Sequence, residues 1–199
     1  MIAGLVLAAG LGRRMGAVKP LINVNGTPSL GRVLSTIDDA GIRSVVVVLG
    51  RDAERIRSAV NLAGRLVVVN PSPERGMASS LTLGISALPP GAEGVLVFHA
   101  DMPFLQSATV RAVSRTGEEA AIAAPSWKGI RGFPVFFRRD QWDELRSTLR
   151  GDTGGKAFLQ GHPDRLRTVE VEDPGCVRDI DCPNDLARQE EISCSGTFE

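Results

Sequence analysis

The residues best suited to chemistry lie in a glycine-rich segment near the N-terminus, between Leu7 and Pro20 (LAAGLGRRMGAVKP). Glycine permits positive φ, so successive backbone N–H groups can converge and form a cradle for an anion. Arg13, Arg14 and Lys19 place positive charge beside that cradle. This combination suits a triphosphate, but a tight strand-to-helix turn flanked by solvated arginines would have the same composition.

Two common phosphate-binding motifs do not fit the spacing of this segment. A P-loop requires a second glycine five residues after the first, and Met15 occupies that position after Gly10. A dinucleotide fingerprint requires G-x-G-x-x-G, and Gly16 lies one residue too far beyond Gly12. The second apolar run ends in Leu49-Gly50-Arg51, without the acidic residue that would bind a ribose.

A carboxylate follows the fourth apolar run, in the sequence Ala100-Asp101-Met102-Pro103. Ligands of open α/β sheets bind at the carboxyl ends of the strands, where a carboxylate can hold Mg²⁺ against phosphates. A lone aspartate at such a position also occurs as a turn or helix cap, so both roles stay open for Asp101. His99 is interpreted as a packing residue, because its neighbours form an apolar strand.

A second pair of acids, Asp179 and Asp181, stands near the C-terminus in VRDIDCPNDL. Residues two apart share one face of an extended chain, so both carboxylates would point the same way. Either of them could complete a metal site with Asp101, and the spacing alone does not choose between them.

Paired serines follow a glycine turn in Glu74–Leu81 (ERGMASSL), after the third apolar run. At the start of a helix, hydroxyls and free N–H groups can bind a ligand. The same hydroxyls can simply cap the helix, so the segment predicts either a binding site or a cap.

Two later segments place positive charge near glycines. In Arg131-Gly132-Phe133-Pro134 the arginine could bind a phosphate bidentately, or the segment could be a turn that enters an edge strand. In Gly151–Leu159 (GDTGGKAFL) a phosphate could bind beside Lys156 at a helix start, or Asp152 could cap that helix.

Short valine-rich runs alternate along the chain with segments of helical periodicity. The runs are apolar throughout, which is typical of strands covered on both faces, and repeated strand–helix–strand units favour a mostly parallel sheet with right-handed crossovers. Asp52 is the expected N-cap of the second helix. The expected strands are Gly4–Ala8, Ser44–Leu49, Arg65–Val69, Gly94–Phe98, Ala120–Ala124, Phe133–Arg138 and Leu166–Glu170. The expected helices are Ser29–Ala40, Asp52–Ala63, Met77–Leu88, Gln141–Leu149, Asp152–Leu159 and Pro183–Glu191.

The composition excludes several classes of function. The 199 residues fit one domain, and 23 basic residues balanced by 23 acidic ones give no global positive field for nucleic acid. No apolar run approaches the ~20 residues that cross a bilayer, and the N-terminus lacks the pattern of a signal peptide. Three cysteines without metal-site spacing indicate reduced thiols in a cytoplasmic protein, and two histidines nearly exclude a multi-histidine zinc site.

The loop L-A-A-G-x-G-x-R-M-G-x-x-K resembles the signature loop of the MobA-like NTP transferases, and within them that of the molybdenum cofactor cytidylyltransferases. The further motifs described above follow in the order of that family, so the resemblance covers nearly the whole chain. It implies a single-domain, Rossmann-like α/β sandwich of three layers with a mostly parallel sheet, of the nucleotide-diphospho-sugar transferase type. The domain would span residues 1–192, and residues 193–199 would form a flexible tail.

The resemblance also implies roles for individual residues. Asp101 and Asp181 would hold Mg²⁺, with Asp181 favoured because the wider superfamily uses that position for metal; Cys182 replaces the usual threonine beside it. Lys19, Arg13 and Asp101 would be catalytic. The nucleotide would bind to Leu7, Ala8, Ala9, Gly10, Gly12, Arg13, Lys19, Gly76, Ser79 and Ser80. The acceptor would bind to Arg131, Gly132, Pro134, Gly154, Gly155 and Lys156.

The activity that the resemblance implies is transfer of CMP from CTP to the phosphate of molybdopterin, with Mg²⁺ as cofactor and pyrophosphate as product. Ala9 and the G-D-x-G segment indicate this subgroup, because the GTP-using relatives typically have glycine in place of Ala9 and usually lack the second segment. A molybdoenzyme client or its chaperone would be a further partner. Three alternatives stay open. The first is a related transferase that uses GTP or another NTP with a different acceptor, such as a sugar phosphate. The second is an NAD(P)H-dependent oxidoreductase of the wider group, and the third is a nucleotide-binding chaperone without catalysis.

Overall fold

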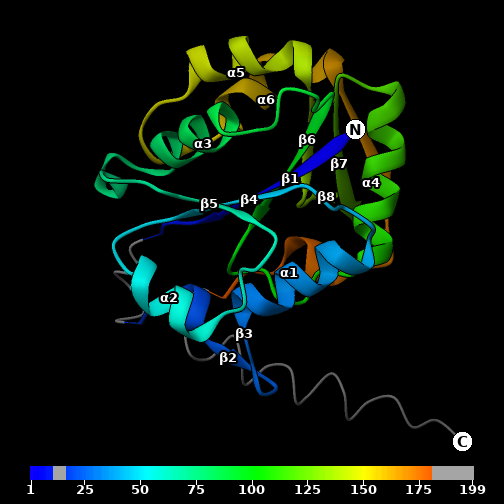
Figure 1. Ribbon diagram of the computed structural model, residues 1–199. Coiled ribbons are helices and arrows are strands. Elements are labelled where there is room, and N and C mark those ends of the chain that lie inside the picture. Colours follow the sequence, from blue (N-terminus) through cyan, green and yellow to red (C-terminus); the bar gives the residue numbers. More distant parts are fainter. Residues whose placement is uncertain (11–16, 181–199) are drawn as a thin grey trace, which may run out of the picture.

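The computed structural model describes residues 1–10 and 17–180, which form one mixed sheet with helices on both faces (Figure 1). The strands of the main sheet are β1 (Ile2–Ala8), β4 (Val45–Leu49), β5 (Leu66–Val69), β6 (Gly94–His99), β7 (Ile122–Trp127), β8 (Ile130–Arg131), β9 (Val135–Arg138) and β10 (Leu166–Glu170). Their order across the sheet is β10-β7-β9-β6-β1-β4-β5, with β8 paired to β7. A separate hairpin consists of β2 (Asn23–Val24) and β3 (Thr27–Pro28).

Helices cover both faces of this sheet and enclose two apolar clusters (Figure 1). The helices on one face are α1 (Ser29–Asp39), α2 (Ala53–Ala59) and α4 (Ser107–Glu119); those on the other are α3 (Met77–Ser86), α5 (Trp142–Thr148) and α6 (Lys156–Gly161). The single-domain α/β architecture with a mostly parallel sheet is therefore confirmed. None of the helices in the described ranges is long and apolar enough to cross a membrane.

The central strands have the residues that a doubly covered sheet requires. All five residues of β4 are buried valines and leucine, and β1 is buried from Ala3 onward. Side chains alternate across a strand, so an apolar residue at every position supplies both clusters at once. The seven strands expected from the sequence are all present, within a few residues of the expected ends.

Strand β9 departs from the sequence-based expectation. It lies antiparallel between β6 and β7, in the interior of the sheet, so the alternative that this segment enters an edge strand is wrong. Pro134 stands just before the first residue of β9, where a missing N–H costs no ladder hydrogen bond. The ring of Phe136 fills the space beside Gly94 and Gly117, where an added Cβ would lie 2.2 and 2.5 Å from ring atoms.

Several helices differ from their expected bounds. Helix α4 was not expected at all, α2 ends at Ala59 rather than Ala63, and α6 begins at Lys156 after a separate 3₁₀ turn at Gly151–Thr153. Asp52 precedes α2 as expected, but its carboxylate accepts a hydrogen bond from Arg55 instead of capping the helix. The expected helix at 183–191 and the tail at 193–199 lie outside the described residues.

Candidate functional site

The carboxyl ends of β1, β4 and β6 meet at one edge of the sheet, and the sequence motifs gather there. In the parallel register Leu7 lies opposite Val48 on one side and His99 on the other. The N–H of Ala100 donates to the carbonyl of Leu7, 3.1 Å away. The glycine-rich segment after β1 and the aspartate after β6 therefore leave the sheet side by side, at the edge where open α/β sheets bind ligands.

A lysine and a carboxylate from distant parts of the chain meet at this edge. The Nζ of Lys19 lies 3.3 Å from Oδ2 of Asp101, and the side chains are only 17% and 21% exposed. Lys19 begins a 3₁₀ turn, Lys19–Leu21, in which Pro20 is buried. The structure thus brings together two of the three residues predicted to be catalytic. The third, Arg13, and the nucleotide-binding candidate Gly12 lie outside the described residues.

Four of the predicted nucleotide-binding residues form the end of β1 and the first residues beyond it. Leu7, Ala8 and Ala9 are buried in the core, and only Gly10 is exposed. A nucleotide at this point would therefore meet backbone groups rather than side chains of β1. This arrangement agrees with the anion-cradle chemistry of a glycine-rich turn.

His99, at the end of β6, packs against the acceptor-side motif. Its ring lies 4.3 Å from that of Phe133 in an edge-to-face arrangement. Burial lowers the pKa of His99 below its ordinary value; the charges of Asp101 and Asp179 act in the raising direction, and that of Lys19 in the lowering one. The packing interpretation of His99 agrees with these contacts, and the lowered pKa favours the neutral ring near pH 7.

The C-terminal residues of the described chain, Asp173–Ile180, form a strap along the same edge. The N–H of Ile180 donates to the carbonyl of Asp101, 2.9 Å away, which brings the neighbouring Asp179 to the site. Asp173 anchors the other end of the strap from a buried position. Asp181, the favoured second metal ligand, directly follows this strap in sequence but lies outside the described residues.

The residues at this edge suit a hard cation that is held mainly by substrate. Among the described residues, no group of three His, Cys, Asp or Glu side chains is arranged to hold a metal ion. Mg²⁺ usually keeps several waters and binds through one or two carboxylates plus substrate phosphates. Asp101, with its carboxylate beside Lys19 at this edge, fits that pattern and would hold the metal.

The paired serines at the start of α3 take part in an internal network. Asn70, just after β5, donates from Nδ2 to the hydroxyl oxygens of Ser79 and Ser80 at 2.8 and 2.9 Å. Ser79 in turn donates to the carbonyl of Gly76 at 2.8 Å. Ser80 is buried and Ser79 is partly exposed, so Ser79 has the more accessible hydroxyl of the two. The predicted contacts of these serines with base or ribose stay predictions.

The acceptor motif around Arg131 lies at the same edge, because β9 runs antiparallel and starts beside the end of β6. Arg131 is exposed at the end of β8, whereas Gly132 and Pro134 are buried. Gly132 lies against the strap, where an added Cβ would be 2.2 Å from the carbonyl oxygen of Cys176. This arrangement leaves the guanidinium of Arg131 accessible for the predicted acceptor phosphate.

The second acceptor motif lies against α3. Oδ1 of Asp152 accepts a hydrogen bond from the N–H of Met77, the first residue of α3, at 3.3 Å. The alternative that Asp152 caps the helix of its own segment is therefore wrong; Gly155 is the N-cap residue of α6. Gly154 is buried beneath Met77, and Lys156 is exposed as the first residue of α6.

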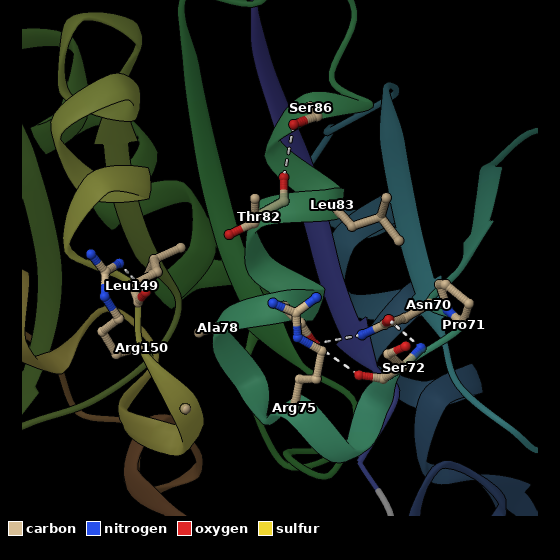
Figure 2. A pocket seen from close by; sticks show the side chains of 12 residues that line it. Asn70, Pro71, Ser72, Arg75, Ala78, Thr82, Leu83, Ser86, Leu149 and Arg150 are labelled. Atoms are coloured by element: carbon tan, nitrogen blue, oxygen red, sulfur yellow. Dashed lines mark hydrogen bonds between the residues drawn. The ribbon is translucent and has the colours of Figure 1, made fainter.

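A groove of about 590 Å³ runs along the outer side of α3 (Figure 2). Figure 2 shows Leu149 and Arg150 on one side of the helix and Asn70 on the other. The lining is made by Asn70, Pro71, Ser72, Arg75, Ala78, Ser79, Thr82, Leu83, Ser86, Leu149, Arg150 and Gly151. Among the predicted site residues that the structure describes, only Ser79 lines the groove, which therefore adjoins the predicted nucleotide site without containing Lys19 or Asp101.

Sequence reasoning missed one residue at the predicted nucleotide side, Asn70, and the contact partner of another, Asp152. Asn70 follows β5 as Asp101 follows β6, and a polar residue after an apolar strand was the signal that could have identified it. Asp152 was recognised as a cap, but its partner helix lies 75 residues away along the chain. No local pattern contains a contact of that range.

The comparisons with known proteins cover almost the entire chain. The model of the MobA-like NTP transferase domain matches residues 4–168. Nicotine blue oxidoreductase of Paenarthrobacter nicotinovorans is 27% identical over 195 residues, which cover 94% of this chain and 95% of that protein. The crystal structure of Rv0371c from Mycobacterium tuberculosis H37Rv superposes with a TM-score of 0.87 at 33% identity, covering 96% of this chain and 97% of that chain. Its complex with manganese gives a TM-score of 0.82 at 30% identity, covering 96% and 98%.

Proposed function

The chain belongs to the MobA-like NTP transferase family, and we propose that it transfers CMP from CTP to the phosphate of a molybdopterin-type acceptor, with release of pyrophosphate. A transferase that uses a nucleoside triphosphate follows from the family. The choice of CTP and of the acceptor is supported by Ala9 and by the G-D-x-G segment, whose resemblance is to the cytidylyltransferase subgroup.

The observation that carries this proposal is the pair formed by Lys19 and Asp101 at the edge of the sheet where β1 and β6 end. Nucleotidyl transfer requires a cation for the phosphate oxygens and a carboxylate for the metal, close to backbone groups that can hold a triphosphate. The pair formed by Lys19 and Asp101 at the carboxyl ends of β1 and β6 supports the proposal by supplying the first two of these groups. Rv0371c, which has the same fold, was crystallised in complex with manganese, and this supports the proposal that the present chain also binds a divalent cation. Mg²⁺ is the ion proposed here.

In the proposed reaction a phosphate oxygen of the acceptor attacks the α-phosphorus of CTP, and the bond to the pyrophosphate oxygen breaks. A phosphate monoester is largely anionic near neutral pH, so the attacking oxygen needs no strong general base. Burial lowers the pKa of His99, which disfavours its protonated form and is consistent with that chemistry. Lys19 would offset charge on the phosphates, and Arg131 would orient the acceptor. Mg²⁺, when bound by Asp101, supplies a further positive charge against the phosphate oxygens.

The test is pyrophosphate release measured with each NTP and each acceptor. We expect selective use of CTP and molybdopterin, and a fall of about 10²–10³ in rate for Lys19→Ala and for Asp101→Ala. Arg138→Ala is the control, since Arg138 is exposed, pairs with Asp140 and lies opposite Gly94 at the other end of β6. Turnover like that of the wild type in either site variant, with the fold intact, would refute the assigned roles.

Related transferases would share the same pair and loop, so the assay also separates them. Preference for GTP or another NTP, or for a sugar phosphate, would replace the proposed substrates while keeping the reaction class. Binding of CTP without turnover would instead favour a nucleotide-binding chaperone that delivers a cofactor.

An oxidoreductase is the second candidate function. The full-length similarity to nicotine blue oxidoreductase favours it, whereas the spacing of the glycines, which breaks the dinucleotide fingerprint, does not. Calorimetry with CTP, GTP, ATP and NADPH, each with Mg²⁺, discriminates between the two. Binding of NADPH without binding of any NTP would replace the transferase proposal.

A further inference from the structure

The first turn of α3, Gly76–Ser80, is held from two sides by residues far away in the sequence. On one side Asn70 donates to both serine hydroxyls. On the other, the 3₁₀ turn Gly151–Thr153 lies directly against Gly76. Figure 2 shows Asn70 and Arg150 flanking the helix at these two sides.

The contact between the two turns leaves no room for a side chain. A Cβ on Gly76 would lie 2.4 Å from the carbonyl carbon of Gly151 and 2.6 Å from Oδ1 of Asp152. Gly76 also has φ 90°, a backbone conformation that residues with side chains rarely adopt. The two backbones are therefore packed against each other, so a movement of one turn must displace the other.

The start of α3 has no cap from its own side chains. Gly76 occupies the N-cap position, and the helix N–H of Met77 is bonded instead by the carboxylate of Asp152. A negative charge at this end of a helix also interacts favourably with the helix dipole. Met77 is fixed further by its sulfur, which lies over Gly154, where an added Cβ would be 2.7 Å away.

We propose that Asp152 is a positioning residue for the nucleotide, acting through the first turn of α3. This inference rests on the proposed function, in which the Gly76–Ser80 turn receives the nucleoside part of the NTP. The carboxylate holds the N–H of Met77 and, through it, would keep the rest of that turn, including Ser79, in position. The Gly151–Thr153 turn thereby serves the nucleotide side of the site, although its sequence suggests a contact with the acceptor.

The experiment compares Asp152→Ala, Asp152→Asn and the neighbouring control Thr153→Ala. Thr153 is exposed and its hydroxyl donates only to the carbonyl of Arg150 within the same turn. We expect Asp152→Ala to raise the Kd of CTP–Mg²⁺, measured without acceptor, and the KM for CTP by about fivefold. The kcat and the KM for the acceptor should stay within twofold. Asp152→Asn should bring the Kd and the KM for CTP back to within twofold of the wild type, because its amide oxygen can accept the same hydrogen bond and only the interaction of the charge with the helix dipole is lost.

Hydrogen exchange of the Met77 amide gives a readout that does not depend on catalysis. Its protection should fall in Asp152→Ala and stay unchanged in Thr153→Ala. Unchanged CTP affinity in Asp152→Ala, or a rise confined to the KM for the acceptor, would overturn the inference while leaving the proposed function intact. A wild-type protein that binds no NTP would overturn both, and the exchange of Met77 would still report whether the cap itself exists.

Discussion

Replacing Asp173 with alanine should test how the strap Asp173–Ile180 is held at the site. Asp173 is 2% exposed, and its two carboxylate oxygens accept three hydrogen bonds. Oδ2 accepts from the N–H of Gln106 at 3.0 Å and from the hydroxyl of Thr109 at 2.7 Å, and Oδ1 accepts from the N–H of Gly175 at 2.8 Å. The side chain thus joins the start of α4 to the start of the strap.

The magnitude follows from the two backbone donors that would lose their acceptor. A buried donor without a partner costs about 1–3 kcal/mol, and water that enters the vacated space would recover part of this. We therefore expect Asp173→Ala to lower the free energy of unfolding by about 3 kcal/mol, or Tm by roughly 6–12 °C for a chain of this size. Thr109→Val, which removes one hydroxyl donor and leaves the carboxylate bonded, should cost only about 1 kcal/mol.

Urea unfolding followed by the fluorescence of Trp127 and Trp142 would measure both variants. The other end of the strap contacts Asp101, because the N–H of Ile180 donates to its carbonyl. At a temperature where both variants are folded, Asp173→Ala should therefore reduce the rate of pyrophosphate release more than Thr109→Val does. If Asp173→Ala unfolds within 0.5 kcal/mol of the wild type, the hydrogen bonds of Asp173 do not hold the strap, and the reasoning fails.

Two further predictions concern the core and the alkaline range. Gly117→Ala should destabilise the protein by about 1–2 kcal/mol, because its Cβ would lie 2.5 Å from the ring of Phe136. Thermal unfolding should show a smaller cost for Gly117→Ala in a Phe136→Leu background, and equal costs in the two backgrounds would rule out the steric explanation. Burial raises the pKa of the Cys176 thiol to about 11. As the pH rises, the thiol ionises in the unfolded chain before it ionises in the folded protein. The contribution of Cys176 to the free energy of unfolding should therefore be fully present below about pH 9 and fall by roughly 2 kcal/mol up to pH 11. A pH series of urea unfolding should show that this part of the decline vanishes in Cys176→Ala. The chain has no tyrosine, which removes one competing titration in the same pH range. A decline in Cys176→Ala identical to that of the wild type would contradict the assignment.

The sequence was most informative where a single local pattern determines the structure. Runs of buried valine such as Val45–Val48 predict interior strands, because no exposed face interrupts them. Helix α4 was missed although its buried residues have helical spacing, because the segment is polar on average and two of the four buried residues, Thr109 and Gly117, do not mark an apolar face. The interior position of β9 depends on pairing with strands on both sides, which no local signal in Val135–Arg138 contains.

The same distinction applies to the candidate site. Lys19 was expected in the site from its place in the glycine-rich segment and Asp101 from its place after a strand, and the family resemblance implied a catalytic role for both. The carboxyl ends of β1 and β6 do share an edge, where the two side chains meet. The partnership of Asp152 with Met77 could not be expected, since it arises from the packing of two glycine-rich turns from different motifs. Arg13 and Asp181 lie outside the described residues, so their roles stay predictions.

The placement of β9 has a consequence for the cooperativity of the molecule. Within the described chain, β5, β4, β1 and β6 form one part of the sheet and β7, β8 and β10 another, and every ladder hydrogen bond between the two parts passes through β9. Separation of the parts must therefore break both ladders of this one strand, so the N–H groups of β9 should exchange with solvent only when the whole domain unfolds. The motif Arg131–Pro134 thus leads directly into β9, the strand that connects the two parts of the sheet.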